Sequence, residues 1–301
     1  MEQRKAILSE ICQLASLEFI GKNIEINGLN LCNRPTKYAS ILAYVTSNRF
    51  FDAVFYNQAV KAVVLSEELY QELGVEARKQ GKELSYIISD RPEFLYYDIH
   101  NLLWDKTDFY DHFTDEPVIG ENCKIHPTAV IEKGVVIRNN VIIGPNSVVR
   151  SGSLIDDNVS IGCCSVIGSE GFQAIKGYDK MIKHVGGTHI CHDVHIADNS
   201  TIGNSLFEGV VEVGAYTIID NHCYIAHNTK IGEHCVITAC CVMMGSTVLE
   251  DDVWLAPNSV VRNGRTVKQG ATVGTLAFVN KDVEPGTTVV GIPAKELILN
   301  K

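Results

Sequence analysis

The sequence predicts a mainly β protein in which a parallel β-helix follows a small α/β domain. An aliphatic residue returns at every sixth position over most of the chain beyond residue 115. Neither the 3.6-residue period of a helix nor the two-residue period of a strand generates this repeat. Short strands joined by tight corners do generate it, and such a period is typical of a solenoid. Residues 1–115 lack the repeat and alternate apolar runs with helical patterns, which indicates an α/β domain.

The repeat has three uninterrupted series of aliphatic anchors. They are Ile119, Ile125, Ile131, Ile137, Ile143, Val149, Ile155, Ile161 and Ile167, then Ile190, Ile196 and Ile202, then Val213, Ile219, Ile225, Ile231, Ile237, Met243, Leu249, Leu255, Val261, Val267, Val273 and Val279. We expect the anchors to point inward and the Gly, Asn, Asp and Pro residues between them to form corners. The breaks, over Gly171–Thr188 and near Asn204–Val210, are expected to build a site on one face.

The N-terminal region predicts helices over 5–15 and 67–79 and buried strands over 61–66 and 84–89. Asp90 is expected to cap a third helix that runs to Leu103, with Pro92 in its first turn. The expected domains are therefore an α/β domain over 1–115, a β-helix over 116–290 and a short C-terminal tail over 291–301.

Composition narrows the possible partners. The formal charge is 26 − 36 = −10, which disfavours nucleic acid because nucleic-acid binding needs a cationic surface. No apolar run has the length of a signal peptide or a membrane span, so we expect a cytoplasmic protein without membrane insertion. In that compartment the ten cysteines are expected to be reduced thiols.

The repeat resembles that of the hexapeptide-repeat transferase superfamily. The resemblance implies a left-handed β-helix in which three hexads make one triangular coil of eighteen residues. The stretch IDNHCYIAHN contains Asp220, Asn221 and His227, and it resembles the catalytic segment of the UDP-3-O-acylglucosamine N-acyltransferases of the lipid A pathway. Two further segments, IGSEGF (Ile167–Phe172) and YVTSNRF (Tyr44–Phe50), resemble segments of the same family.

The resemblance implies roles for the residues of this stretch. His227 is the expected general base that takes a proton from an attacking sugar amine, and the ordinary histidine pKa of about 6.5 suits that task. Asp220 is expected to orient the imidazole. Asn221 is expected to contact the sugar or the acyl donor.

Coil length places one more residue beside His227. The position one coil further is 227 + 18 = 245, which is a glycine. Neighbouring coils lie about 4.8 Å apart, so the Gly245 N–H is expected to sit where an oxyanion needs a donor. The family has its oxyanion amide at the matching glycine.

The resemblance also implies substrate-binding residues. In the family, two aromatics of the N-terminal segment sandwich uracil and an Asn between them hydrogen-bonds it. Tyr44 and Phe50 retain the aromatics, and Ser47 replaces the Asn. Phe172 and His184, both in the first break of the repeat, are the other expected substrate contacts.

Two features favour acyl-CoA as the co-substrate, and we expect no bound cofactor and no metal. The chain ends GIPAKELILNK, which resembles the end of coenzyme A-dependent acetyltransferases and not helices that dock acyl carrier protein. The acidic balance also gives no attraction to an acidic carrier. The family's second histidine, downstream of IAHN, falls on Gly264 here.

We therefore expect a homotrimeric N-acyltransferase acting on a UDP- or dTDP-linked amino sugar. Three alternatives stay open. One is the lipid A enzyme itself, using acyl carrier protein. Another is a zinc enzyme resembling the γ-class carbonic anhydrases, with His222 and His227 among its ligands. The last is a catalytically silent nucleotide-sugar binder.

Overall fold

The computed structural model describes residues 5–207 and 209–297. The chain divides into two compact units. The first unit contains the residues up to His112 together with Gln173–Lys183, and the second contains Phe113–Phe172 and the residues from His184 onward. The first break of the repeat thus contributes its middle part to the N-terminal unit, although the sequence assigned all of it to the β-helix domain. No helix of the described residues is both long and apolar enough to cross a membrane.

The first unit is built on a four-stranded parallel sheet in the order β3-β4-β5-β6. Its elements are β1 (Ala6–Ile7), α1 (Leu8–Leu14), β2 (Glu25–Ile26), β3 (Gly28–Leu29), β4 (Ile41–Tyr44), the 3-10 helix η1 (Asn48–Phe50), α2 (Phe51–Tyr56), β5 (Val60–Leu65), α3 (Glu67–Gln80), β6 (Ser85–Ile88) and α4 (Pro92–Lys106). The α/β class of this region is confirmed.

Two details of the N-terminal prediction are wrong. The first helix begins at Leu8, because Ala6 and Ile7 pair antiparallel with β2. The N-cap of α4 is Arg91 and not Asp90, and no side chain caps this helix. Pro92 does occupy its first turn, as its fixed φ favours.

Helix α4 holds the segment Gln173–Lys183. The His100 ring donates from Nε2 to the Lys183 carbonyl (2.8 Å) and accepts at Nδ1 from the Tyr110 hydroxyl (2.8 Å). Tyr178 donates to the Asp98 carboxylate (2.9 Å). Burial lowers the pKa of His100 to about 4, so at physiological pH its neutral ring links Tyr110 to Lys183 by two hydrogen bonds.

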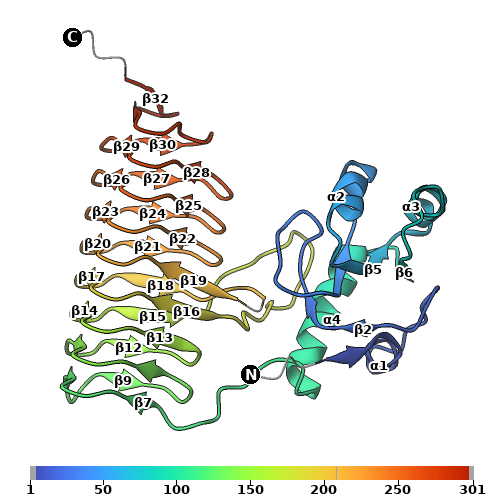
Figure 1. Cartoon of the computed structure of the whole chain (residues 1–301), viewed down its shortest axis with the longest axis horizontal. Helices are drawn as coiled ribbons and strands as arrows, with labels where there is room; N and C mark the ends of the chain where they lie inside the picture. Colours follow the sequence, from blue (N-terminus) through green and yellow to red (C-terminus); the bar gives the residue numbers. More distant parts are fainter. Residues whose placement is uncertain (1–4, 208, 298–301) are drawn as a thin grey trace. The chain divides into compact units, whose positions relative to one another are not determined.

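The second unit is a three-sided parallel β-helix, whose stacked coils are seen in Figure 1. Sheet one contains β7 (Val118–Ile119), β10 (Val136–Ile137), β13 (Ser153–Ile155), β16 (Gly187–Ile190), β19 (Val210–Val213), β22 (Lys230–Ile231), β25 (Val248–Leu249) and β28 (Thr266–Val267). Sheet two contains β8 (Lys124–Ile125), β11 (Ile142–Ile143), β14 (Ser160–Ile161), β17 (His195–Ile196), β20 (Ile218–Ile219), β23 (Val236–Ile237), β26 (Trp254–Leu255), β29 (Thr272–Val273), β31 (Thr288–Val290) and β32 (Lys295–Glu296). Sheet three contains β9 (Val130–Ile131), β12 (Val148–Val149), β15 (Val166–Ser169), β18 (Thr201–Gly203), β21 (Tyr224–Ile225), β24 (Val242–Met243), β27 (Val260–Val261) and β30 (Phe278–Val279).

The anchors form the core of the β-helix as expected. From Ile137 to Val279 every anchor side chain is almost fully buried in one continuous cluster. Anchors of the first coil are more open, and Ile119 is 47% exposed because no coil lies beyond it in the repeat. Burial of stacked aliphatic side chains supplies most of the stabilisation of such a repeat.

Corner residues explain the polar half of each hexad. The second residue of most corners has a positive φ, as at Asn140 (60°), Asn158 (60°) and Asn258 (58°). Asn tolerates this left-handed region better than most non-glycine residues. The tail predicted for 291–301 includes β32, which pairs antiparallel with β31, and residues 298–301 lie outside the described residues.

Candidate active site

Both breaks of the repeat leave the β-helix at the corners between sheet three and sheet one. The first insertion joins β15 to β16, and the second joins β18 to β19. His227 occupies the same kind of corner between β21 and β22, and Gly245 occupies it between β24 and β25. We call this column of corners the insertion edge. Both insertions, His227 and Gly245 therefore lie along one edge of the β-helix.

His227 lies against Gly245. Strands β21 and β24 pair with an offset of eighteen residues, and a Cβ added to Gly245 would stand 2.5 Å from Cε1 of the His227 ring. Only a glycine at 245 therefore leaves the ring in its place. The expected stacking is confirmed. No hydrogen bond of the described residues uses the Gly245 N–H, which leaves this donor available to a ligand.

His184 brings a second imidazole to the insertion edge. It comes from the first insertion, and its ring centroid lies 5.3 Å from that of His227 at an interplanar angle of 65°. Both residues are nearly buried, at 7% and 9% exposure. Gly171 makes room for His184, because an added Cβ at Gly171 would stand 2.5 Å from the His184 Nε2.

Asn204 positions the first insertion. The sequence analysis did not predict this role. Its Oδ1 accepts from the Gly171 N–H (3.1 Å), and its Nδ2 donates to the His184 carbonyl (2.9 Å). The register of β18 with β21 places Asn204 one coil before His227. The one sequence feature that indicated a role for Asn204 was its position at the start of the second break in the repeat.

Asn228 holds the second insertion in the same way. Its Oδ1 accepts from the Ser205 hydroxyl (2.6 Å) and from the Leu206 N–H (2.8 Å). Its backbone has a φ of 56°. Two side-chain amides thus hold the insertions at this edge: Asn204, one coil before His227, binds the first insertion on both sides, and Asn228, next to His227, binds the second.

Asp220 and Asn221 lie at a different corner, between sheet two and sheet three. The Asp220 carboxylate accepts from the backbone and side-chain N–H groups of Asn221 (2.7 and 3.0 Å). The Asn221 Oδ1 accepts from the Asp198 N–H of the preceding coil (2.8 Å). Within one chain Asp220 and His227 therefore lie at neighbouring corners, at the two ends of strand β21. The predicted role of Asp220 in orienting His227 stays a prediction.

Phe172 precedes the part of the first insertion that belongs to the N-terminal unit. Its side chain is 66% exposed. The structure therefore leaves it open to solvent in one chain and does not pack it against the two imidazoles. Its predicted role in substrate binding stays a prediction.

The aromatic pair of the N-terminal segment is not in ring contact. The Tyr44 ring packs against Tyr96, with centroids 4.9 Å apart, and its hydroxyl donates to Glu93 (3.0 Å). Burial raises the pKa of Tyr44 well above its usual range. Phe50 is half-buried in η1 under the Arg49 guanidinium (4.7 Å). Ser47 precedes η1 without capping it. These contacts give Tyr44 a structural role whether or not it binds a base.

A pocket that the sequence did not predict lies in the first unit. It has a volume of about 540 Å³ and is lined by the start of α4 and by the segment 173–183. The Arg91 guanidinium lies 4.0 Å from the Phe94 ring centroid, and Tyr178 packs edge-on against Phe94 (5.3 Å). Lys180 pairs with Asp98 (2.6 Å). Aromatic faces beside cationic groups suit a base and its phosphates.

The histidines of the zinc alternative do not converge within one chain. His222 lies at a corner between sheets two and three, whereas His227 lies on the insertion edge. His192 contacts Asp193 (2.9 Å), and His195 contacts the Ser160 hydroxyl (2.6 Å). This distribution gives no support to a three-histidine site in a single chain.

The geometry of the insertion edge can therefore support proton transfer and anion stabilisation. One imidazole can take a proton, the second can contact a bound group, and an adjacent N–H can stabilise a developing negative charge. Such a set suits acyl transfer without a covalent intermediate. The buried Cys223 lies behind the sheet-two to sheet-three corner, where its Sγ donates to the Thr238 carbonyl (3.2 Å).

Comparison with known proteins identifies the class of the repeat. The family profile described as bacterial transferase hexapeptide (six repeats) matches residues 116–151, 134–169 and 211–245. These matches lie within the hexapeptide repeats of the second unit, which build a left-handed parallel β-helix.

Similar proteins of known name include acyltransferases. Over 131 residues the chain is 40% identical to the UDP-3-O-acylglucosamine N-acyltransferase of Methylobacterium sp. (strain 4-46), a match that covers 43% of this chain and 37% of that protein. The chain thus spans less than two fifths of the length of this relative. The UDP-N-acetylglucosamine acyltransferases from Campylobacter jejuni (TM-score 0.56, 19% identity, 63% of this chain and 74% of that chain) and Bacteroides fragilis 9343 (0.53, 24%, 62% and 73%) share the fold.

Proposed function

We propose that this protein is an N-acyltransferase that moves an acyl group from acyl-CoA to the amine of a UDP- or dTDP-linked amino sugar. The observation that carries the proposal is the His227 ring stacked on Gly245 at the edge where both insertions leave the β-helix. The 40% identity to a UDP-3-O-acylglucosamine N-acyltransferase supports the same chemistry.

The reaction would be a direct attack. The sugar amine forms a C–N bond to the thioester carbonyl carbon while His227 takes the amine proton. The Gly245 N–H stabilises the oxyanion of the tetrahedral intermediate. The C–S bond then breaks, and the proton passes to the sulfur so that coenzyme A leaves as a thiol. A general base contributes about 10²–10⁴-fold, and one oxyanion donor about 10²–10³-fold.

The proposed acyl donor follows from the charge of the chain. A net charge of −10 gives no long-range attraction to an acidic carrier protein, so we propose acyl-CoA in the cytoplasm. The identity to the Methylobacterium protein supports a second candidate, namely the reaction that its name describes. That reaction acts on UDP-3-O-acylglucosamine, and its donor can be tested directly.

The nucleotide is proposed to bind the first unit. Support comes from the half-buried aromatics Tyr44 and Phe50 beside Ser47, and from the pocket that Arg91 and Phe94 line. Because Ser47 replaces the family's Asn, thymine and uracil are both candidates for the base.

We also propose that the active unit is a homotrimer. Ile218, Val236 and Trp254 follow one another in one column of sheet two, where Ile218 and Trp254 are 47% and 50% exposed, and a contiguous exposed apolar patch marks a protein contact. Asp220 could act on a His227 ring only across a subunit interface. Light scattering that shows a stable and active monomer would contradict this part of the proposal.

A thiol-release assay tests the proposed reaction. Purified protein is offered UDP- and dTDP-amino sugars with short and long acyl-CoAs, and in parallel with acyl carrier protein thioesters. Mass spectrometry of the sugar nucleotide should show one added acyl group on nitrogen. Activity with the carrier protein alone would favour the second candidate. No acyl transfer with any donor and acceptor would overturn both.

A further inference from the structure

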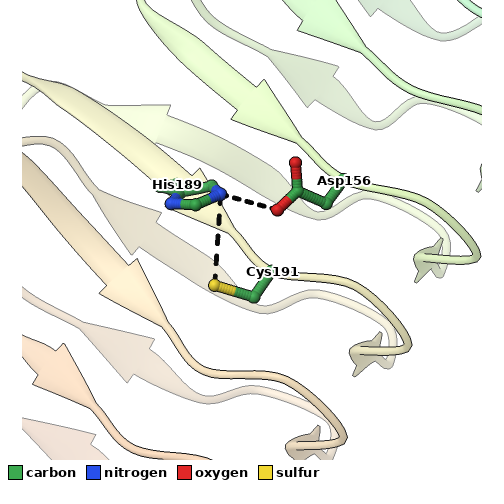
Figure 2. Close-up of side chains that lie close together, drawn as sticks. All are labelled: Asp156, His189 and Cys191. Atoms are coloured by element: carbon green, nitrogen blue, oxygen red, sulfur yellow. Dashed lines mark hydrogen bonds and ion pairs between the residues drawn. The ribbon is translucent and has the colours of Figure 1, made fainter.

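Three metal-ligating side chains of different kinds converge on sheet one. Asp156 follows β13, His189 lies within β16, and Cys191 follows β16. Figure 2 shows the three side chains pointing toward one another. The His189 Nε2 lies 2.8 Å from the Asp156 Oδ2 and 4.0 Å from the Cys191 Sγ. One ligand atom from each residue lies within 4.8 Å of the other two.

The arrangement is not that of a nucleophile, a base and an orienting acid. In such a triad the imidazole contacts the nucleophile with one nitrogen and the acid with the other. Here the same Nε2 of His189 faces both Asp156 and Cys191, as the two dashed lines in Figure 2 show. Three donor atoms that converge on one point are the pattern that a bound cation requires.

The distances are close to those of a tetrahedral zinc site. Zinc bonds of about 2.0–2.1 Å to nitrogen and oxygen and about 2.3 Å to sulfur imply separations of about 3.4 Å between N and O and about 3.6 Å between N and S. The observed separations of 2.8 and 4.0 Å differ from these by less than 1 Å. Side-chain rotations of that size suffice to form the site.

The surroundings also suit a cation. The side chains of His189 and Asp156 are 25% and 28% exposed, so an ion can enter while being largely covered by protein. Glu212 pairs with His189 in the register of β16 and β19. Its carboxylate therefore adds negative charge close to the Cys191 thiol.

We propose that Asp156, His189 and Cys191 bind a divalent cation of the zinc class. Sulfur, imidazole and carboxylate ligands together favour Zn²⁺ over Mg²⁺ or Ca²⁺. Strands β13 and β16 are paired neighbours on either side of the first insertion. The bound ion ties the coil before this insertion to the coil after it, and it stabilises the insertion from a face that His227 does not use.

Cobalt(II) is the probe for this site, because a cobalt–thiolate bond gives an intense near-ultraviolet charge-transfer band. The full chain, stripped with chelator and then dialysed, should bind one equivalent of Co²⁺ with that band. Zn²⁺ should displace the Co²⁺ and raise the midpoint of thermal unfolding. The variant C191S should lose the band. The matched control C164S removes an exposed thiol at another corner and should keep it.

A second measurement keeps the proposal testable if C191S does not fold. In the wild-type chain, Zn²⁺ should slow the alkylation of Cys191 by iodoacetamide, whereas the exposed Cys164 should react at an unchanged rate, as peptide mass spectrometry would report. Absence of Co²⁺ binding, a band that persists in C191S, or equal alkylation of Cys191 with and without Zn²⁺ would each overturn the proposal.

Discussion

Replacing Gly245 by alanine tests whether the position of the His227 ring matters. The added Cβ would stand 2.5 Å from Cε1 of that ring, whereas carbon atoms pack at about 3.5–4.0 Å. The imidazole must therefore move by about 1 Å. A displacement of that size at a reacting group costs about 10²-fold in rate, which corresponds to about 2.7 kcal/mol of transition-state free energy.

The effect should fall on kcat and leave the fold intact. Gly245 has no positive φ, so alanine is compatible with its backbone. Steady-state thiol release with the best donor and acceptor gives kcat, and circular dichroism reports the fold. The control is Asn263→Ala, which changes the exposed residue at the same corner one coil further and should keep full activity. A G245A enzyme with unchanged kcat would refute a catalytic role for this arrangement.

Three further changes act on stability. Burial lowers the pKa of His100 from 6.5 to about 4, so the folded chain keeps this side chain neutral. The unfolded chain binds the proton more readily, and acid therefore favours unfolding. The free energy of unfolding of the first unit should drop by about 3 kcal/mol between pH 6.5 and pH 4. Urea titrations of His100→Gln should lack this part of the pH dependence, and an unchanged slope would contradict the assignment. Asn204→Ala removes the amide contacts to Gly171 and His184 and should cost about 1–3 kcal/mol, seen as faster hydrogen exchange in the first insertion; unchanged exchange would argue against the clamp. Ile237→Ala, at a fully buried anchor, should cost about 2–5 kcal/mol in chemical denaturation, and a cost below about 1 kcal/mol would contradict the packed core.

The β-helix could be predicted because its energetics are periodic. Each hexad needs one buried aliphatic side chain and one turn-forming corner. The resulting six-residue period can be recognised in the amino-acid sequence alone. The same arithmetic correctly stacked Gly245 on His227, since residues one coil apart share a corner.

The separate corners of Asp220 and His227 show that closeness along the sequence does not mean contact in this repeat. Asp220 and His227 are seven residues apart, which in a solenoid of six-residue sides means neighbouring corners and not contact. Only offsets of a whole coil share an edge. Closeness along the sequence, which suggests contact in a compact loop, is misleading here.

The insertions set the other limit on prediction. They interrupt the six-residue spacing, so residues on their two sides cannot be aligned by counting. The period therefore could not place Asn204 one coil before His227 or His184 beside the His227 ring. Nor could the sequence show that Gln173–Lys183 belongs with the first unit, because that depends on specific contacts such as the one between His100 and Lys183. Such contacts depend on side-chain geometry and not on pattern.

We propose His227 as the general base of acyl transfer to an amino-sugar nucleotide. This role is tested most directly by single-turnover acyl transfer with the His227→Ala variant, using the donor and acceptor that the wild-type chain prefers. The ring lies at a corner and outside the aliphatic core, so the variant should keep the wild-type circular dichroism spectrum. Its rate should fall about 10²–10⁴-fold. A folded variant that transfers the acyl group at the wild-type rate would contradict the account.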